Sequence, residues 1–388
     1  RETDQDPMTC TAGKLAELFA PEQRTTCHGA DGLRGHIRTI WEATLGRGVP
    51  DDQTDFFTLG GHSLRAAEVV RRLRGDGHNL TVADFFAHPT IESLVGLLRG
   101  RRRTITDAEL IAATRLADDI RPDLAAPMDP IRTAEPKHIL VTGATGFLGS
   151  RVVIDLLEHT NATVHCLVRG TSPDAARERL NTRMARFGLS YTTERLDVLN
   201  GDLQEPCLGL SAEQWNALCR DCDLVLHMGA SVNLLDSFDH MMRPNMIGTT
   251  ELLRLASTVR LKAFQHISTI SVVLGKALEQ YDLTEDMRVA PSSVLRSGYA
   301  MTKWGAEELV LQARERGLPA NILRLSRVAQ DRQTGTHNPQ DAQLLFLRAG
   351  VLVGSYPDSS PEFAASPSDA VPVDDLAQWI RVLMLHTS

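Results

Sequence analysis

Tyr299 and Lys303, in the stretch SGYAMTKW, have residue types and a spacing that could carry acid–base chemistry. Four residues apart on a helix, the two side chains share one face. A free tyrosine has a pKa of about 10 and is a poor acid or base at neutral pH, but a neighbouring ammonium stabilises the phenolate and lowers that pKa. The pair therefore favours proton transfer by Tyr299, although a Tyr-x3-Lys spacing also arises by chance.

Thr269 closes the apolar stretch FQHIST, residues 264–269, and is a second candidate for chemistry. Open α/β sheets bind ligands at the carboxyl ends of their strands, where a threonine hydroxyl can donate a hydrogen bond to a carbonyl oxygen. The alternative is an ordinary threonine that ends a strand.

A glycine-rich turn, TGATGFLG at residues 142–149, follows the apolar run HILVT. Gly143 would allow the tight turn, Gly146 would let the backbone approach a pyrophosphate, and Gly149 would let the next helix lie close to the sheet. The helix N-terminus then offers free N–H groups to the anion. We therefore predict a dinucleotide site here, to which the same loop adds Thr145, Phe147 and Leu148.

Arg169, at the end of the next strand-like stretch TVHCLVR, indicates which dinucleotide is bound. Proteins that prefer NAD place a carboxylate there for the ribose hydroxyls. A guanidinium can instead bind a 2′-phosphate in a bidentate way, so NADPH is favoured over NADH. Arg179, in RERL, is either a second phosphate ligand or an exposed helix charge.

Helices and strands must position these residues, and the hydrophobic pattern of the chain predicts two kinds of region. From Lys137 onward, apolar runs at 138–142, 163–169, 222–228, 264–269 and 321–326 alternate with helical periodicity. That alternation predicts a doubly wound parallel sheet with helices on both faces, an α/β fold. Residues 33–98 instead show short helical patterns typical of a small bundle, with Thr90 as a helix N-cap.

Composition excludes several classes of protein. The 388 residues carry a formal net charge of −8, which argues against nucleic acid as the main partner. We find no apolar stretch long enough to span a bilayer and no signal-peptide pattern. The 6 cysteines form no disulfide framework, which suits a reducing cytoplasm. Cys219 and Cys222 form a CxxC without a second ligand pair, so we predict a half-buried pair at a strand entry and no metal site.

The glycine turn, Thr269 and the Tyr299–Lys303 pair, in this order, resemble the extended short-chain dehydrogenase/reductase superfamily, with its Rossmann-type sheet. The resemblance implies catalytic roles for Thr269, Tyr299 and Lys303, with Lys303 also holding the nicotinamide ribose. It further implies cofactor-site roles for Asp202 and Leu203 in NGDL, Gly229 and Ala230 in HMGA, and Asn245 in PNMIGT, the last supporting the lysine through water.

Ser63, in DFFTLGGHSL at residues 55–64, lies in a different motif. The stretch resembles the attachment site of a peptidyl carrier protein, and the resemblance extends over residues 33–98, including HPTIESL. It implies a small four-helix bundle in which Ser63 receives 4′-phosphopantetheine at a helix N-terminus. The alternative is that Ser63 is a plain helix N-cap.

The rest of the chain, from about Ala117, resembles a terminal thioester reductase domain of a nonribosomal peptide synthetase in ADDIRPDL, VHCLVRG, GDLQEPCLGLS, TGTHNPQDAQ and VPVDDLAQWI. The implied activity is NADPH-dependent release of a carrier-bound acyl or peptidyl thioester as an aldehyde, with onward reduction to an alcohol as a further option. The alternatives are a redox-neutral cyclising release domain, a carboxylic acid reductase-type fragment, and an inert carrier-plus-scaffold fragment.

The resemblance also implies a domain plan. Residues 1–30 would be the tail of an adenylation domain, where Lys14 falls on the lysine that contacts the acyl-adenylate, and the initial Arg1 would fit an excised piece. Residues 31–100 would be the carrier, 101–136 a linker with the start of the reductase, and 137–388 the reductase, with an incomplete C-terminal capping part. The implied partners are upstream adenylation and condensation domains and a phosphopantetheinyl transferase.

Overall fold

The computed structural model describes residues 30–76, 78, 80, 82–100, 105–129, 134–191, 194–232, 238–277, 284–295, 297–353 and 369–385. The chain divides into two compact units, Arg1–Ile105 and Thr106–Ser388, and each is described by itself. The stretch around Lys14 lies outside the described residues. In the part of the chain that is described, no helix combines the length and apolar character needed to cross a membrane.

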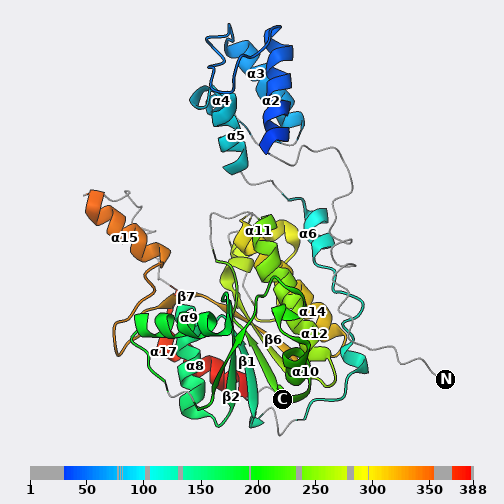
Figure 1. Cartoon of the computed structure of the whole chain (residues 1–388), viewed down its shortest axis with the longest axis vertical. Coiled ribbons are helices and arrows are strands. Elements are labelled where there is room, and N and C mark those ends of the chain that lie inside the picture. Colours follow the sequence, from blue (N-terminus) through cyan, green and yellow to red (C-terminus); the bar gives the residue numbers. More distant parts are fainter. Residues whose placement is uncertain are drawn as a thin grey trace, which may run out of the picture. The chain divides into compact units, whose positions relative to one another are not determined.

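The first unit is built from four described helices (Figure 1). These helices pack around aromatic side chains. The rings of Trp41 and Phe56 meet edge-on with centroids 4.8 Å apart, and Phe56 meets Phe85 in the same way at 4.9 Å. Thr90 caps a helix as predicted, since its Oγ1 accepts a hydrogen bond from the Ser93 N–H at 3.1 Å. The helices are α2 (Ala30–Leu45), α3 (Ser63–Gly75), α4 (Val82–Ala87) and α5 (Ile91–Gly100).

The second unit contains a six-stranded sheet in the order β3-β2-β1-β4-β5-β6, in which every neighbouring pair is parallel. The predicted α/β class and its five strands are confirmed; β3, at the edge of the sheet, was not predicted. The strand order reverses between β1 and β4, where such sheets bind ligands. The strands are β1 (His138–Thr142), β2 (Thr163–Val168), β3 (Leu196–Asn200), β4 (Leu224–His227), β5 (Ala263–Thr269) and β6 (Ala320–Leu325).

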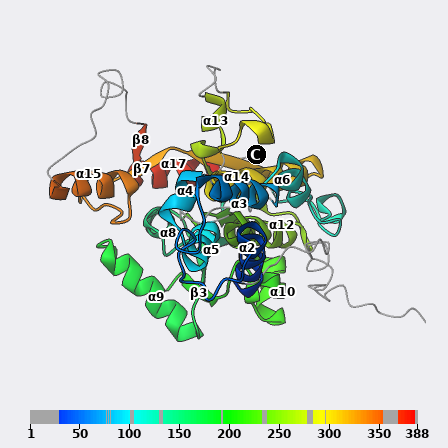
Figure 2. The same ribbon diagram turned by 90° about the horizontal axis from the view of Figure 1, so that it is seen from above.

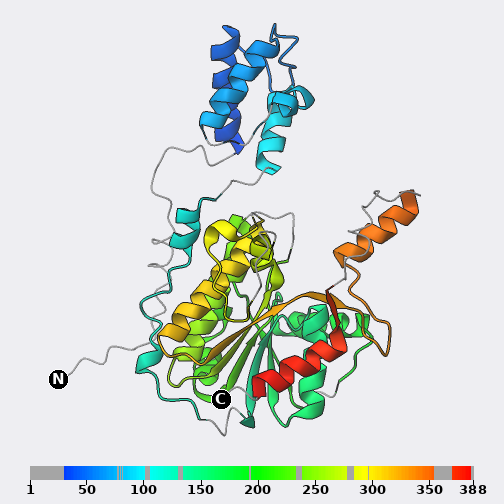
Figure 3. The ribbon, with the colours of Figure 1, turned by 180° about the vertical axis from the view of Figure 1, so that it is seen from behind.

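Helices cover both faces of this sheet (Figures 1 and 3). One layer holds α8 (Phe147–His159), α9 (Pro173–Arg186) and α17 (Val373–Leu385). The other holds α10 (Ala212–Asp221), α12 (Gly248–Ser257) and α14 (Gly298–Glu315). α9 lies alongside the edge strand β3 (Figure 2). An ion pair between Arg381 and the buried Asp155, 2.6 Å long, ties α17 to α8.

Short elements complete the described fold. The segment that opens the second unit packs against α14: Gln312 Nε2 donates to the Thr114 carbonyl at 2.7 Å, and the Leu116 N–H donates to Gln312 Oε1 at 3.0 Å. The remaining elements are α6 (Asp107–Ala113), η1 (Pro122–Leu124), η2 (Pro206–Gly209), α11 (Phe238–Met242), the π-helical η3 (Arg243–Ile247), η4 (Ile270–Val272), α13 (Leu274–Ala277), η5 (Pro291–Ser293), β7 (Arg327–Ala329), α15 (Ala342–Val353) and β8 (Ala370–Pro372).

The CxxC pair is more buried than predicted. Cys219 on α10 is 1% exposed and Cys222, just before β4, is 0% exposed. Burial raises the pKa of each thiol to about 11, so both remain protonated at neutral pH. The prediction of a half-buried pair is wrong because Cys219 lies on the buried side of α10 and Cys222 lies at the entry to the buried strand β4.

Candidate active site

The glycine turn between β1 and α8 leaves no room for side chains at two positions. A Cβ on Gly149 would lie 2.1 Å from the Gly143 carbonyl oxygen, and a Cβ on Gly143 would lie 2.7 Å from the Met228 carbonyl carbon. Gly143 also has a φ of +78°, a conformation that favours glycine. Backbone therefore packs against backbone where the N-terminus of α8, the turn and the end of β4 meet. Because no side chain lies between them, the free N–H groups of α8 are accessible to an anion.

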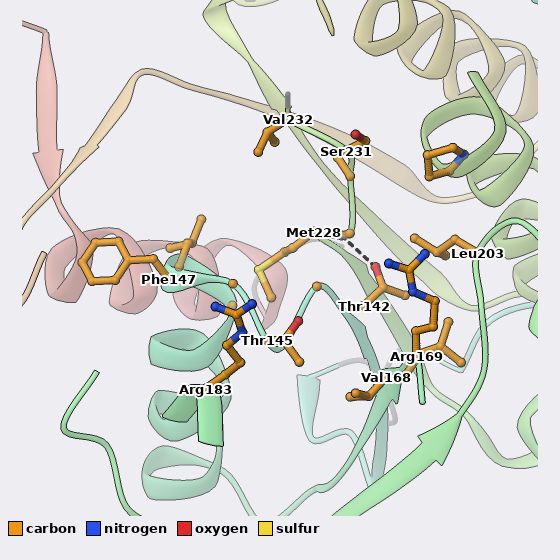
Figure 4. A pocket seen from close by; sticks show the side chains of 18 of the residues that line it. Thr142, Thr145, Phe147, Val168, Arg169, Arg183, Leu203, Met228, Ser231 and Val232 are labelled. Carbon is orange, nitrogen blue, oxygen red and sulfur yellow. Dashed lines mark hydrogen bonds between the residues drawn. The ribbon is translucent and has the colours of Figure 1, made fainter. Parts of the chain in front are cut away.

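A cavity of about 780 Å³ opens beside this turn, at the carboxyl ends of β1, β2 and β4. Figure 4 shows it lined by side chains from the turn, from the end of β2 and from the loop after β4. The structure brings together in its lining the following residues proposed from the sequence: Gly143, Thr145, Gly146, Phe147, Leu148, Gly149, Arg169, Arg179, Asp202, Leu203, Gly229 and Ala230.

Four arginines line one part of this cavity, and the sequence had pointed to two of them. Arg179 Nη1 donates to the Arg169 carbonyl at 3.0 Å, and Arg169 Nη1 lies 3.7 Å from Asp202 Oδ2. Arg183 and Arg186 line the same cavity, and Figure 4 draws Arg183 beside the turn. Their spacing from Arg179, at i+4 and i+7 on α9, was the signal that could have found them.

The arginines repel one another, which suits the site to an anion. The pKa of Arg179 is lowered, first by burial and then by the charges of Arg169 and Arg183. Arg169 keeps 60% of its side chain exposed, so its guanidinium is accessible to a ligand. A bound phosphate would offset this repulsion and accept charge-assisted hydrogen bonds.

Thr269 and Tyr299 meet beside the cavity. Thr269 ends β5 and Tyr299 lies in the first turn of α14, close enough for the Thr269 hydroxyl to influence the ionisation of the phenol. The Ser271 N–H donates to Thr269 Oγ1 at 3.2 Å, which fixes the hydroxyl at the end of its strand. Ser297 caps α14 by accepting from the Ala300 N–H at 3.1 Å, so the tyrosine is held on the first turn of a capped helix.

The ionisation of Tyr299 differs from the sequence prediction. Burial raises the pKa of Tyr299, and the nearby Thr269 hydroxyl opposes this without reversing it. The prediction of a lowered pKa is wrong for this structure, because desolvation of the phenolate is the largest effect on this half-buried side chain. Tyr299 therefore remains a neutral phenol at neutral pH, the form that can donate a proton.

Lys303 lies one turn further along α14 and is 3% exposed. Its Nζ donates to the Ile267 carbonyl at 2.7 Å and approaches His266 Nε2 at 3.1 Å. Burial lowers the pKa of Lys303 to about 8, and the Glu307 carboxylate opposes that shift. Ile267 lines the cavity, whereas Thr269, Tyr299 and Lys303 are not in its lining but adjoin it through β5.

Asn245, in the π-helical turn η3, connects the cavity to α14. Its Oδ1 accepts from the Ser231 N–H at 2.7 Å, and its Nδ2 donates to Thr302 Oγ1 at 3.0 Å. Ser231 lines the cavity and Thr302 precedes Lys303. Asn245 is buried, and the structure therefore places it behind the cavity wall, where it positions the neighbours of the lysine.

A buried histidine, which sequence reasoning did not single out, supports the loop after β4. His227 Nδ1 lies 2.7 Å from Thr142 Oγ1, and its Nε2 lies 3.0 Å from Thr249 Oγ1. The Gly229 N–H also donates to Thr142 Oγ1, at 2.9 Å. Burial, with a smaller effect of the Lys303 charge, lowers the pKa of His227 to about 3, so the ring is neutral and relays hydrogen bonds between β1 and α12.

In the first unit, Ser63 is the first residue of α3 and His62 occupies the N-cap position. The structure therefore does not support the alternative that Ser63 is the N-cap. The glycines before it have a packing role, because a Cβ on Gly61 would lie 2.3 Å from the Phe56 ring, and Gly60 has a φ of +86°. The turn thus starts α3 directly at the serine.

Comparisons with known proteins match both units. Residues 141–380 match the family model described as male sterility protein, an NAD-binding family, and residues 36–98 match the phosphopantetheine attachment site model. The isonitrile lipopeptide synthase of Streptomyces coeruleorubidus is 32% identical over 91% of this chain, and a linear gramicidin synthase protein of Brevibacillus parabrevis is 32% identical over 86%. This chain spans only 24% and 7% of the lengths of those two proteins.

Solved structures give the same assignment. The terminal R domain from the myxalamid PKS-NRPS biosynthetic pathway is 34% identical with a TM-score of 0.64, covering 71% of this chain and 69% of that one. A thiolation-reductase di-domain from an archaeal nonribosomal peptide synthetase covers 91% of this chain and 75% of its own, with a TM-score of 0.58 and 23% identity, and supports the fold. The chain therefore belongs to the male sterility protein family of NAD(P)-binding domains, among the reductase domains of nonribosomal peptide synthetases, and carries a phosphopantetheine-attachment domain ahead of it.

Proposed function

We propose that this chain reduces an acyl or peptidyl thioester, tethered to its own carrier unit, and releases the product as an aldehyde with NADPH as reductant. The observation that carries the proposal is the proximity of Thr269 and Tyr299 at the carboxyl end of β5, next to Ile267 of the cavity lining, with Lys303 one turn further along α14. Relatives named aldehyde reductase lnaA, 28% identical, and L-2-aminoadipate reductase large subunit, 29% identical, support a reductase chemistry.

The residues present fit a phosphorylated dinucleotide. The turn admits no Cβ at Gly143 or Gly149, which leaves backbone N–H groups for the pyrophosphate. Arg169, Arg179 and Arg183 would hold the 2′-phosphate, and their mutual repulsion favours that anion over a hydroxyl. When bound, NADPH supplies a hydride, so that thioester, hydride and one proton give an aldehyde and the carrier thiol.

The chain's own residues handle the oxygen and the proton. Thr269 and Tyr299 donate hydrogen bonds to the thioester carbonyl oxygen and stabilise the negative charge that develops on it. Tyr299 supplies the proton because its raised pKa keeps the phenol protonated at neutral pH. Lys303 holds the cofactor ribose through its ammonium group.

The carrier unit makes the reaction intramolecular. We infer that Ser63 bears the phosphopantetheine arm, that residues 31–100 form the carrier, and that the reductase begins within 101–136 and continues through 137–388. Tethering raises the effective concentration of the thioester to the order of millimolar, so the reductase does not need to bind a free acid tightly. The arm implies a phosphopantetheinyl transferase as a partner, together with upstream synthetase domains that load it.

The test uses the phosphopantetheinylated chain loaded with an acyl group. We expect loss of the near-ultraviolet absorbance of NADPH together with an aldehyde that a hydrazine reagent traps. Onward reduction would appear as an alcohol and a second equivalent of NADPH consumed. If NADPH is not consumed and a cyclic product forms, the chain is a redox-neutral release domain and the reductase proposal is wrong.

A further inference from the structure

We propose that His266 is a positioning residue that accepts a hydrogen bond from the Lys303 ammonium and thereby fixes its direction and keeps it charged. The inference deepens the proposed function and rests on it for the role of Lys303. The position of His266 on β5, three residues before Thr269, also places it directly beneath the end of the strand that carries the proposed chemistry.

The charge on Lys303 determines which atom accepts. His266 is 0% exposed, and its Nε2 lies 3.1 Å from Lys303 Nζ. An ammonium has three donors and no acceptor, so the imidazole must offer a lone pair at Nε2 and carry its proton at Nδ1. The Ile267 carbonyl accepts a second ammonium hydrogen at 2.7 Å, and the third hydrogen has no acceptor among the described residues, so a ligand could accept it.

Packing alone does not account for a histidine here. His266 Nδ1 is buried and has no hydrogen-bond partner among the described residues. A buried donor without a partner is destabilising, and a phenylalanine or leucine at this point of β5 would avoid that cost. The contact with Lys303 is what a histidine provides and an apolar side chain does not.

The groups that face this contact favour a neutral ring beside a charged lysine. The His227 ring lies 5.2 Å from the His266 ring, from β4, and is itself neutral. Burial, followed by the charges of Lys303 and His227, holds the pKa of His266 well below its usual value. From α14, Tyr299 is an uncharged phenol, and Glu307 favours the ammonium.

Glu307 cannot replace His266 as the acceptor, because its oxygens have other partners. Arg324 Nη2 donates to Glu307 Oε2 at 2.8 Å and Ser268 Oγ donates to Oε1 at 2.5 Å. The charge of Glu307 therefore acts on Lys303 at a distance, whereas the direct acceptors for the ammonium are the Ile267 carbonyl and His266.

The direction of the pH effect follows from these contacts. Loss of an acceptor disfavours the ammonium, so the pKa of Lys303 falls further below about 8. A hydrogen bond to a charged group is worth enough to move that pKa by about one unit. If the charged lysine is the working form, the alkaline limb of the rate profile moves to lower pH by the same amount.

The experiment measures Lys303 directly, in the full chain. The lysines are labelled with ¹³C at Cε, and their signals are followed by NMR as the pH is changed. The signal that is absent in Lys303→Arg is the signal of Lys303. We expect His266→Phe to lower the Lys303 pKa by about one unit, and His266→Gln, whose amide oxygen can reach the Nε2 position, to restore most of it. Phe264→Leu, on the same strand and also 0% exposed, is the matched control and should leave the titration unchanged.

Two results would overturn the inference without touching the proposed function. One is a Lys303 pKa that is the same in His266→Phe and in the unsubstituted chain. The other is an imidazole ¹⁵N spectrum in which His266 carries its proton at Nε2. This spectrum is recorded on the unsubstituted chain, so it does not depend on a variant that folds. Failure of the unsubstituted chain to oxidise NADPH would instead contradict the proposed reductase function, while the lysine titration would still report on His266.

Discussion

At the scale of single residues, the molecule separates the groups proposed to bind the cofactor phosphate from the groups proposed to transfer a proton. The arginines line an open cavity, and Arg169 keeps most of its side chain exposed. Tyr299 and Lys303 sit on α14, where burial moves their two pKa values in opposite directions, that of the phenol up and that of the ammonium down to about 8. Both shifts favour the uncharged form, as desolvation requires.

Arg169→Ala should weaken NADPH binding far more than NADH binding. The variant removes a charge-assisted contact to the 2′-phosphate, which is worth about 1.5 to 3 kcal/mol and hence roughly a tenfold to hundredfold rise in the Kd. Fluorescence titration of both cofactors measures the effect. Arg177→Ala, an exposed arginine of α9 that does not line the cavity, is the matched control. Equal losses for the two cofactors would refute the phosphate role.

Tyr299→Phe should stop turnover and spare the cofactor. The phenylalanine keeps the ring on α14 but removes the hydroxyl that meets Thr269, so the proton donor is lost. General acid catalysis contributes about a hundredfold to ten-thousandfold to the rate. Stopped-flow measurement of NADPH oxidation, with the Kd for NADPH measured in parallel, tests this. Near-normal turnover would eliminate Tyr299 as the acid.

At the scale of elements, the site depends on how closely one backbone approaches another. The β1–α8 turn, the end of β4 and the loop after it touch through glycines, and the Thr142–His227 contact at 2.7 Å fixes the two strand ends to each other. η3 then links this loop to α14 through Asn245, so the cofactor cavity and the proposed acid share one framework.

Gly149→Ala should disrupt that framework. Its Cβ would lie 2.1 Å from the Gly143 carbonyl oxygen, and backbone cannot swing away as a flexible side chain can. Overpacking of this kind costs about 1 to 3 kcal/mol, so we expect a lower melting temperature of the second unit and a weaker affinity for NADPH. Differential scanning calorimetry and cofactor titration measure both. Gly35→Ala on α2, where a Cβ meets nothing within 4 Å, should leave both unchanged.

At the scale of the whole molecule, the chain holds two units with separate cores, and the proposed reaction needs both. The first unit closes around Trp41, Phe56 and Phe85, and the second around the parallel sheet. The first offers a serine at the start of α3, and the second offers the cavity at the strand ends. In the proposed reaction, a flexible arm on the first unit supplies the thioester to the second.

Ser63→Ala should separate the two functions. The variant cannot carry the arm, so we expect no aldehyde from loading in cis, while the Kd for NADPH stays that of the unsubstituted chain. An acyl group supplied on a separate carrier should restore part of the turnover. The separate carrier must then be present at a concentration near the effective molarity that tethering provides. Undiminished release by Ser63→Ala in cis would show that the arm is attached elsewhere.

The local features could be predicted from the amino-acid sequence, because they depend on neighbours along the chain. Alternation of apolar runs predicted five of the six strands, and the glycine spacing predicted the turn at 143, 146 and 149. β3 was not predicted, since Asp197 and Asn200 are unfavourable in strands and pairing with β2 is what orders it. Helix spacing could also have found Arg183, which lies one turn after Arg179.

Tertiary structure decided the properties that depend on burial and on partners distant in the chain. Sheet order brings residues 169, 202 and 229 to one cavity, and the packing of α14 on β5 joins Thr269 to Tyr299. The rise in the Tyr299 pKa has the opposite sign to the prediction from spacing, because desolvation is set by what surrounds a group and not by its neighbour one turn away. The contact between Lys303 and His266, 37 residues apart, likewise exists only once the helix packs on the strand.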